Sequence, residues 1–474
     1  NNIDKISKNS IKNLFLIIFK KWEEANNNSK IVLQTLFENP PPNYYDLNIE
    51  HINEKINYIN SHIILKAKKF PNVKIIPTNN ISNQIGLRNY YDTRNWHSYG
   101  QYKTYAGLVN VAHSISALVS ATYGSSKKLI ILDLDNTLWG GIFADDGINE
   151  ISLGPDTNDG RAYYEFQKYI LKLKKQGVLL SICSKNNYDN IKKVFSHPYM
   201  LLKEKDFISI KINWDDKYMN IKKICKEVNL SEESCIFVDD NKVEREEVNH
   251  YLPNITVPEI NDNPSKFIEI INNNKFFITF SKKTKEDKIR NKSYKQNVKR
   301  DSYKKKFENK NSFLRSLNTK INIKILDNFS LERSTQLINK TNQFNLTTIR
   351  YDTNGFKKYL KQKYNTAYIA KLTDVYGDHG FTALVIISAI KDYWNIENFL
   401  LSCRILGRRV EEEFLQQIIL IAKKNKISTI KGLYIKSKKN HQCKDFYIKN
   451  KFTKNGDYFY IKTKSFKYAN KYIK

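Results

Sequence analysis

The chain has 474 residues, enough for two to four domains, and no apolar run approaches the roughly 18 residues of a membrane-spanning helix. It carries 79 Lys and Arg against 48 Asp and Glu, a net charge of +31 at pH 7, yet no recognised nucleic-acid module, so we expect no nucleic-acid partner. Five cysteines without a C-x-x-C pair argue against a disulfide framework and a zinc site, and favour a reducing, cytoplasmic compartment.

Residues 1–124 alternate extended and helical patterns. The stretches KIVLQTLF and NVKIIPT are typical of strands, and Leu108, Val111, Ile115 and Val119 share one face of a helix. We therefore expect this segment to form part of an α/β layer.

Residues 125–280 follow a strand, loop, helix pattern. Leu129–Leu132, Val178–Cys183 and Cys235–Val238 are short apolar runs that each end in polar residues, with helical periodicity between them. Continuous apolar strands that alternate with helices predict a parallel sheet covered on both faces. In such sheets the functional crevice lies beyond the carboxyl ends of the strands.

Residues 281–318 are strongly basic and lack Gly and Pro, which predicts a solvated helical linker. Residues 319–474 then form a second α/β unit. Its expected elements begin with the strand INIKILD and the helix SLERSTQLINKTNQF, and they include the strand NFLLSCRIL and the helix VEEEFLQQIILIAKKN.

Two aspartates, Asp133 and Asp135, follow the strand Leu129–Leu132 directly. If the extended geometry continues, both carboxylates point to the same side and repel one another unless a positive charge lies between them. Mg²⁺ would satisfy them, because it takes hard oxygen ligands. Paired aspartates also occur in turns and helix caps, so this stretch alone is weak evidence.

Three further strand ends carry polar groups of matching chemistry. Ser184 follows the next strand and precedes a helical stretch, where a hydroxyl and backbone N–H groups can hold a phosphate. Lys217 can neutralise phosphoryl charge, and Asp239 and Asp240 supply carboxylates for a metal. Together these residues predict a phosphoryl-transfer site with Mg²⁺ at one edge of the sheet.

This order of motifs resembles the haloacid dehalogenase (HAD) superfamily. The resemblance implies that Asp133 attacks phosphorus to form an aspartyl phosphate and that Asp135 acts as acid and base. It also implies metal ligands at the Asp133, Asp135, Asp239 and Asp240 positions. The phosphoryl group of a small phosphorylated substrate would be bound by Thr137, Ser184, Lys185, Asn186 and Lys217.

The spacing of the motifs bears on the substrate. The stretches from Asp133 to Ser184 and from Ser184 to Lys217 are each needed for the helices and strands of the core, so neither has room for a lid domain. A site without a lid excludes water poorly, which suits a large substrate or a partner surface that covers it.

Longer segments resemble the FkbH-like family, whose members join a capless HAD domain to an acyltransferase-like domain of the GNAT type. The matching segments are LDLDNTLWGGIFADDG, LSICSKNN, INWDDK, FVDDNKVEREEV, LINKTNQFNLTT, YGDHGFTALVII and FLLSCRILGRRVEE. The resemblance implies a glyceryl transferase: 1,3-bisphosphoglycerate loses phosphate, and a glyceryl thioester on an enzyme cysteine passes to the phosphopantetheine arm of an acyl carrier protein.

Two cysteines are candidates for that thioester. Cys183 immediately precedes Ser184, although strand alternation can turn it into the core, and Cys403 lies at the end of an expected central strand. The following loop RILGRR resembles a pyrophosphate-binding turn, which implies acyl or phosphopantetheine binding by Arg404, Gly407 and Arg408. Arg409 stands where a small residue is usual in that turn, which disfavours acetyl-CoA.

Residues 1–124 resemble the rear part of an SGNH-hydrolase-like domain without its serine block. The sequence leaves two alternatives to glyceryl transfer. One is a plain phosphatase acting on a sugar or lipid precursor in surface-glycan or secondary-metabolite biosynthesis. The other is a non-catalytic module that docks carrier proteins.

Overall fold

A computed structural model describes residues 8–27, 31–38, 49–70, 72–123, 126–147, 150–277, 294, 296, 300, 303, 307–390, 392–437, 439–468 and 473. Much of the expected basic linker, 281–318, lies outside these residues. No helix in the described part of the chain is long and apolar enough to cross a membrane. The chain divides into two compact units, residues 1–123 with 350–363, and residues 124–349 with 364–474.

The first unit is built around two short parallel strands, β1 (Val32–Thr35) and β2 (Val73–Ile76). Its core includes Trp22, Ile59 and Ile63, all nearly inaccessible to solvent. Its helices are α1 (Lys8–Asn27), α2 (Ile49–Ala67), α3 (Thr78–Ile85), α4 (Leu87–Tyr90), α5 (Thr93–Tyr99), α6 (Tyr105–Thr122) and α17 (Thr353–Leu360).

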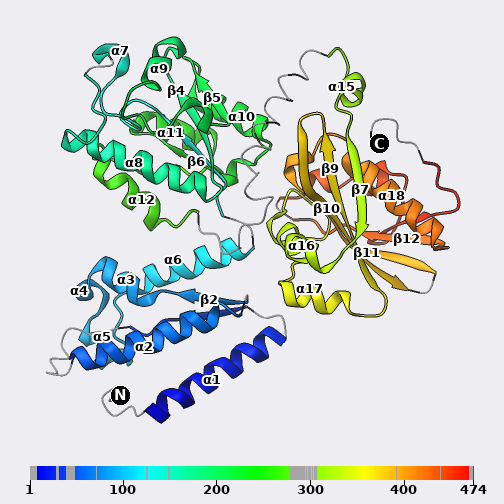
Figure 1. Ribbon diagram of the computed structural model, residues 1–474, viewed down its shortest axis with the longest axis horizontal. Coiled ribbons are helices and arrows are strands. Elements are labelled where there is room, and N and C mark those ends of the chain that lie inside the picture. The colour runs from blue at the N-terminus through cyan, green and yellow to red at the C-terminus, as the bar shows by residue number, and fades with distance from the viewer. Residues whose placement is uncertain are drawn as a thin grey trace. The chain divides into compact units, whose positions relative to one another are not determined.

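The second unit begins with a four-stranded parallel sheet in the order β5-β4-β3-β6 (Figure 1). The strands are β3 (Leu129–Leu132), β4 (Leu179–Ser184), β5 (Ser209–Ile212) and β6 (Cys235–Val238). The helices are α7 (Phe143–Asp146), α8 (Asn158–Lys175), α9 (Tyr188–Val194), α10 (Lys217–Val228), α11 (Lys242–Tyr251) and α12 (Phe267–Asn273). The parallel α/β fold predicted for this part of the chain is therefore confirmed.

The strands β3, β4 and β6 are buried on both faces, which explains why they are largely apolar, whereas the edge strand β5 is mostly only partly buried. Successive side chains of a strand point to opposite faces. Ile130 and Leu132 pack in the cluster that contains residues of α8 and α12, whereas Leu129 and Ile131 pack in the cluster that contains residues of α10 and α11. By the same alternation, Asp133 at the strand end is directed toward the α10 side.

The connections within this sheet are short. Between β3 and β4 the described residues form α7 and α8, and between β4 and β5 they form α9 and a 3₁₀ turn at Glu204–Asp206. In the described parts of these connections no additional domain is inserted, which agrees with the expected absence of a lid.

The rest of the second unit contains a mixed sheet in the order β13-β14-β12-β11-β10-β9-β7, with β8 paired to β11. Figure 1 labels β7, β9, β10, β11 and β12 of this sheet. Only the β11 and β12 pair is parallel among the pairs that the structure describes. The strands are β7 (Lys320–Ile325), β8 (Phe344–Asn345), β9 (Asn365–Asp374), β10 (Gly377–Ile390), β11 (Tyr393–Leu401), β12 (Thr429–Leu433), β13 (Thr453–Asn455) and β14 (Tyr458–Lys462). The helices are α15 (Lys310–Ser316), α16 (Asn328–Lys340), α18 (Val410–Lys424) and α19 (Phe446–Lys449).

Among the element boundaries that differ from the sequence-based expectation, two involve β11. The helix expected to run to Phe344 ends at Lys340, because Phe344 and Asn345 pair with Leu401 and Leu400 of β11. The strand expected to run through Cys403 ends at Leu401, and Cys403–Ile405 forms a 3₁₀ turn. In both cases pairing with a distant strand sets the end of the element, and local periodicity does not report such pairing.

Candidate active site

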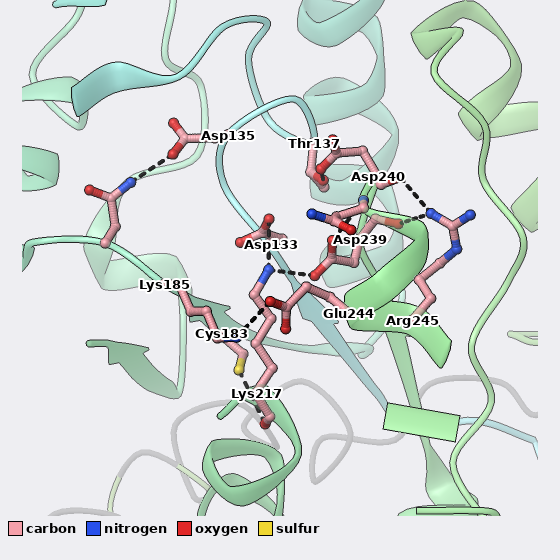
Figure 2. A network of polar contacts seen from close by, with 12 residues as sticks. Asp133, Asp135, Thr137, Cys183, Lys185, Lys217, Asp239, Asp240, Glu244 and Arg245 are labelled. Carbon is pink, nitrogen blue, oxygen red and sulfur yellow. Dashed lines mark hydrogen bonds and ion pairs between the residues drawn. The ribbon is translucent and has the colours of Figure 1, made fainter. Parts of the chain in front are cut away.

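The carboxyl edge of the four-stranded sheet gathers an acidic cluster around one buried lysine (Figure 2). Asp133 follows β3, Asp239 follows β6, and Lys217 is the first residue of α10, which follows β5. The backbone N–H of Asp133 donates to the carbonyl of Val238 at 3.0 Å, so the ladder between β3 and β6 continues to the two acidic positions. The sheet register thus places residues far apart in the sequence at one point.

The Lys217 ammonium bridges two of the carboxylates. Its Nζ lies 2.6 Å from Asp239 Oδ2 and 3.1 Å from Asp133 Oδ2, and all three side chains are less than a tenth exposed. Burial alone would lower the pKa of Lys217, but the two neighbouring carboxylates outweigh it and raise the pKa above its ordinary value. Lys217 therefore stays protonated.

The remaining acidic groups form a site that can hold a metal ion. Ligand oxygens of Asp133, Asp239 and Asp240 all lie within 4.8 Å of one another. Asp133 Oδ1 is buried and has no hydrogen-bond partner, which is costly unless a cation or ligand contacts it. Three carboxylates with one such oxygen match the hard oxygen donors that Mg²⁺ prefers.

Without a metal, burial and mutual repulsion raise the pKa values of two of these acids. Burial, followed by the charge of Asp133, raises the pKa of Asp239 to about 7, although Lys217 opposes the shift. The same two causes raise the pKa of Asp240 to about 6. A divalent cation would favour the ionised forms, so metal binding and proton release are coupled at this site.

Asp135 lies apart from this cluster and is held by three donors. Its Oδ1 accepts from Trp139 Nε1 at 2.9 Å and from the Phe143 N–H at 3.1 Å, and its Oδ2 accepts from Asn186 Nδ2 at 2.7 Å. Burial raises the pKa of Asp135 despite these hydrogen bonds. Trp139 is fully buried, so the Trp-Gly-Gly turn helps to build the site.

The residues expected to bind phosphate lie at the same edge, with partners that the sequence does not reveal. Thr137 Oγ1 donates to Asp240 Oδ1 at 3.4 Å, and Ser184 is buried at the end of β4. Lys185 Nζ donates to Glu244 Oε1 of α11 at 2.6 Å. Glu244 was not anticipated, since nothing local in the sequence marks a contact between the loop after β4 and α11.

Cys183 points into the core. It is fully buried in the cluster on the α10 side of the sheet, and its Sγ lies 3.6 Å from the carbonyl of Lys217. Burial raises the pKa of its thiol, which disfavours the thiolate that a nucleophile needs. Of the two arrangements that the sequence left open, the structure has the buried one.

Cys403 and the RILGRR loop follow β11 in the other sheet. Cys403 is partly exposed, and its Sγ lies 3.3 Å from the hydroxyl of Tyr294. Arg404 and Arg408 are both largely buried; Arg404 Nε donates to Ser402 Oγ at 3.2 Å, and Arg408 Nη1 donates to Asp374 Oδ2 at 2.9 Å.

The Arg408 contact belongs to a buried ionic group that the sequence did not indicate. Asp374 Oδ2 also lies 3.0 Å from His379 Nε2 and 3.3 Å from Arg300 Nη2. Gly407 and Arg409 have φ values of 79° and 62°, the left-handed region in which glycine is favoured. At Arg409 a long side chain therefore occupies a backbone conformation that favours glycine.

A solved structure supports the interpretation of the parallel sheet and its acidic edge. The chain is similar to the N-terminal part of the protein BF1531 from Bacteroides fragilis, which contains a phosphatase domain complexed with Mg. The identity is 26%, the match covers 59% of this chain and 76% of that one, and the TM-score is 0.55.

Other solved structures are more distant. One is an acetyltransferase of the GNAT family from Staphylococcus aureus Mu50, with 16% identity over 30% of this chain and 99% of that one and a TM-score of 0.25. Another is the ribosomal-protein-S18-alanine N-acetyltransferase from Escherichia coli, with 14% identity over 32% and 99% and the same TM-score of 0.25. No model of a known protein family matches the chain, and no curated protein does.

The raised pKa of Asp239 predicts how stability depends on pH in the absence of divalent metal. Between about pH 4 and pH 7 the folded protein holds a proton on Asp239 that the unfolded chain releases, so this group favours the folded state less as the pH rises through that window. We expect the melting temperature of the metal-free protein to fall more steeply from pH 5 to pH 8 than that of the Asp239→Asn variant. Equal slopes in thermal unfolding of the two proteins would contradict this assignment.

Proposed function

We propose that the chain is a Mg²⁺-dependent phosphatase of the HAD type. The observation that carries the proposal is the group of Asp133, Asp239 and Asp240 around Lys217, with one unpartnered Asp133 oxygen at the carboxyl edge of a parallel sheet. The similarity to a phosphatase domain complexed with Mg supports it. A phosphorylated small molecule is the corresponding substrate.

Each residue of the site has a separate role in the proposed reaction. Asp133 is the proposed nucleophile: one of its oxygens attacks phosphorus, the bond from phosphorus to the leaving oxygen breaks, and an aspartyl phosphate forms. Asp135 supplies a proton to the leaving oxygen. It later removes a proton from a water that attacks phosphorus; the bond from phosphorus to Asp133 then breaks, inorganic phosphate leaves, and the Asp133 carboxylate is regenerated. Lys217 and the Ser184 hydroxyl bind phosphoryl oxygens.

Mg²⁺, held by Asp133 and Asp239 with Asp240 beside them, would neutralise charge on the phosphoryl group. The other predicted phosphate-binding groups also have local roles. Asn186 donates a hydrogen bond to Asp135. Lys185 is paired with Glu244, so a phosphoryl group that binds Lys185 competes with the Glu244 carboxylate. This competition favours substrates that carry more than one negative charge.

The finer proposal is glyceryl transfer, which rests on the FkbH-like sequence resemblance. A cysteine thiolate would attack the acyl carbon of 1,3-bisphosphoglycerate and expel its acyl phosphate as inorganic phosphate. The Asp133 site would hydrolyse the remaining phosphate ester, which leaves a glyceryl thioester and a second inorganic phosphate. The phosphopantetheine thiol of an acyl carrier protein would then take the acyl group and release the cysteine. Cys403 is the better candidate than Cys183, because its thiol is partly exposed.

Substitution of the nucleophile tests the phosphatase proposal. Asp133→Asn keeps the side-chain volume but removes the attacking oxygen, and we expect phosphate release to fall by at least about 1000-fold. Chelation of Mg²⁺ in the wild-type protein should have a similar effect. Asp262→Asn, at an exposed position, serves as the matched control and should leave the rate unchanged. A Mg²⁺-dependent rate that survives in Asp133→Asn would contradict the proposed role.

The buried indole of Trp139 provides a second test. Trp139→Phe retains a buried ring but loses the Nε1 donor to Asp135, and we expect kcat to fall about 10-fold while KM changes little, because Asp135 is then less well oriented. Trp394→Phe, at a buried position in β11, is the control. If both variants keep the wild-type kcat in steady-state assays, Trp139 has no part in orienting Asp135.

Intact mass of the acceptor distinguishes the alternative functions. The protein is incubated with 1,3-bisphosphoglycerate, Mg²⁺ and a phosphopantetheinylated carrier protein. A glyceryl adduct on the carrier supports glyceryl transfer, phosphate release alone supports a plain phosphatase, and neither product supports a docking module. In the transfer case we expect Cys403→Ser to abolish the adduct and Cys183→Ala to retain it; the opposite result would assign the thioester to Cys183.

A further inference from the structure

Arg245 lies in the segment FVDDNKVEREEV, where the sequence analysis gave it no role, and it contacts the backbone of both acidic residues that follow β6 (Figure 2). It lies in the first turns of α11, and its side chain reaches back toward the sheet. Its Nη1 donates to the carbonyl of Asp239 at 2.9 Å and to the carbonyl of Asp240 at 2.5 Å. One guanidinium nitrogen thus uses its two N–H groups on two consecutive peptide units.

Those two contacts determine the direction of one side chain. A peptide group is planar, so fixing its carbonyl oxygen fixes the plane. The carbonyls of Asp239 and Asp240 belong to the peptide groups before and after the Asp240 Cα, so Arg245 restrains both backbone dihedrals of Asp240. The direction of the Asp240 Cα–Cβ bond, from which the carboxylate extends, follows from them.

Asp239 and Asp240 differ in how much they depend on this restraint. The Asp239 carboxylate has two other partners, Lys217 Nζ at 2.6 Å and the Asn241 N–H at 2.9 Å. The Asp240 carboxylate has a long side-chain contact, with Thr137 Oγ1 at 3.4 Å, and accepts from its own backbone N–H. Backbone geometry therefore contributes more to placing Asp240 than to placing Asp239.

We propose that Arg245 is a positioning residue of the metal site, which orients the Asp240 carboxylate toward the point shared by Asp133 and Asp239. The proposal rests on the metal site of the proposed function, but it concerns cation affinity and not turnover. Removing a hydrogen bond that orients a metal-ligating residue commonly weakens metal affinity by about 10-fold to 100-fold. The guanidinium charge by itself repels a cation, so the expected loss of Mg²⁺ affinity on its removal comes from the lost orientation of Asp240 and not from the charge.

The chain offers a matched control. Arg161 also donates to a backbone carbonyl, that of Pro155, through Nε at 3.2 Å and Nη2 at 2.9 Å, but it is exposed and lies at the start of α8. Arg161→Met therefore removes an equivalent hydrogen-bonding side chain without touching the acidic cluster.

The experiment measures Mg²⁺ affinity by titration calorimetry on the full chain without substrate. We expect Arg245→Met to weaken Mg²⁺ binding at least about 10-fold, Arg245→Lys to recover part of the loss, and Arg161→Met to stay within about twofold of the wild type. Because Arg245 acts through Asp240, the double variant Arg245→Met/Asp240→Asn should bind no more weakly than Asp240→Asn alone. Circular dichroism confirms that each variant is folded, and Arg245→Gln replaces any Arg245→Met protein that is not.

Three results would overturn the proposal: wild-type affinity in Arg245→Met, losses that add in the double variant, or a wild-type protein that binds no Mg²⁺. Phosphate release is measured on the same preparations. A protein that binds Mg²⁺ with the expected Arg245 dependence but releases no phosphate would refute the phosphatase and leave this inference standing. If the wild-type protein releases phosphate but Arg245→Met binds Mg²⁺ with unchanged affinity, the phosphatase proposal stands and the inference about Arg245 is wrong.

Discussion

The ion pairs of Lys217 with Asp133 and Asp239 are the interaction on which the site depends. Three carboxylates crowded at a buried sheet edge would otherwise repel one another and take up protons, as the raised pKa values of Asp239 and Asp240 indicate. One ammonium offsets only part of that repulsion. The remaining negative charge and the unpartnered Asp133 oxygen make the site a receptor for a cation.

The parallel sheet makes this concentration of charge possible. Its strands β3, β4 and β6 are buried on both faces, so the polar residues gather where the strands end, and the register of β3 with β6 brings Asp133 beside Asp239. The helices that follow the strands contribute further residues to this edge. Lys217 begins α10, and Arg245 reaches back from α11 to the loop that it follows. Short connections leave the acidic edge without an inserted lid in the described residues.

The partners of several motif residues were much harder to anticipate than the motif residues themselves. Glu244 pairs with Lys185, Trp139 and Asn186 hold Asp135, and Arg408 joins a buried group with Asp374 and His379. None of these contacts follows from periodicity or from spacing along the chain. Each depends on which face of an element meets which loop, and a local pattern carries no information about that.

The sequence by itself determined the parallel sheet, the exact ends of the strands β3 and β6, and the short connections. It could do so because an apolar run marks a buried strand and the polar residues that interrupt it mark the turn. It also located Asp133, Asp239 and Asp240 at strand ends and singled out Lys217 as a phosphoryl-binding group. Only the tertiary structure decided that Cys183 faces the core and that Arg408 pairs with the buried carboxylate of Asp374 in β9. Those outcomes depend on side-chain direction and on partners distant in the chain, which are fixed by packing.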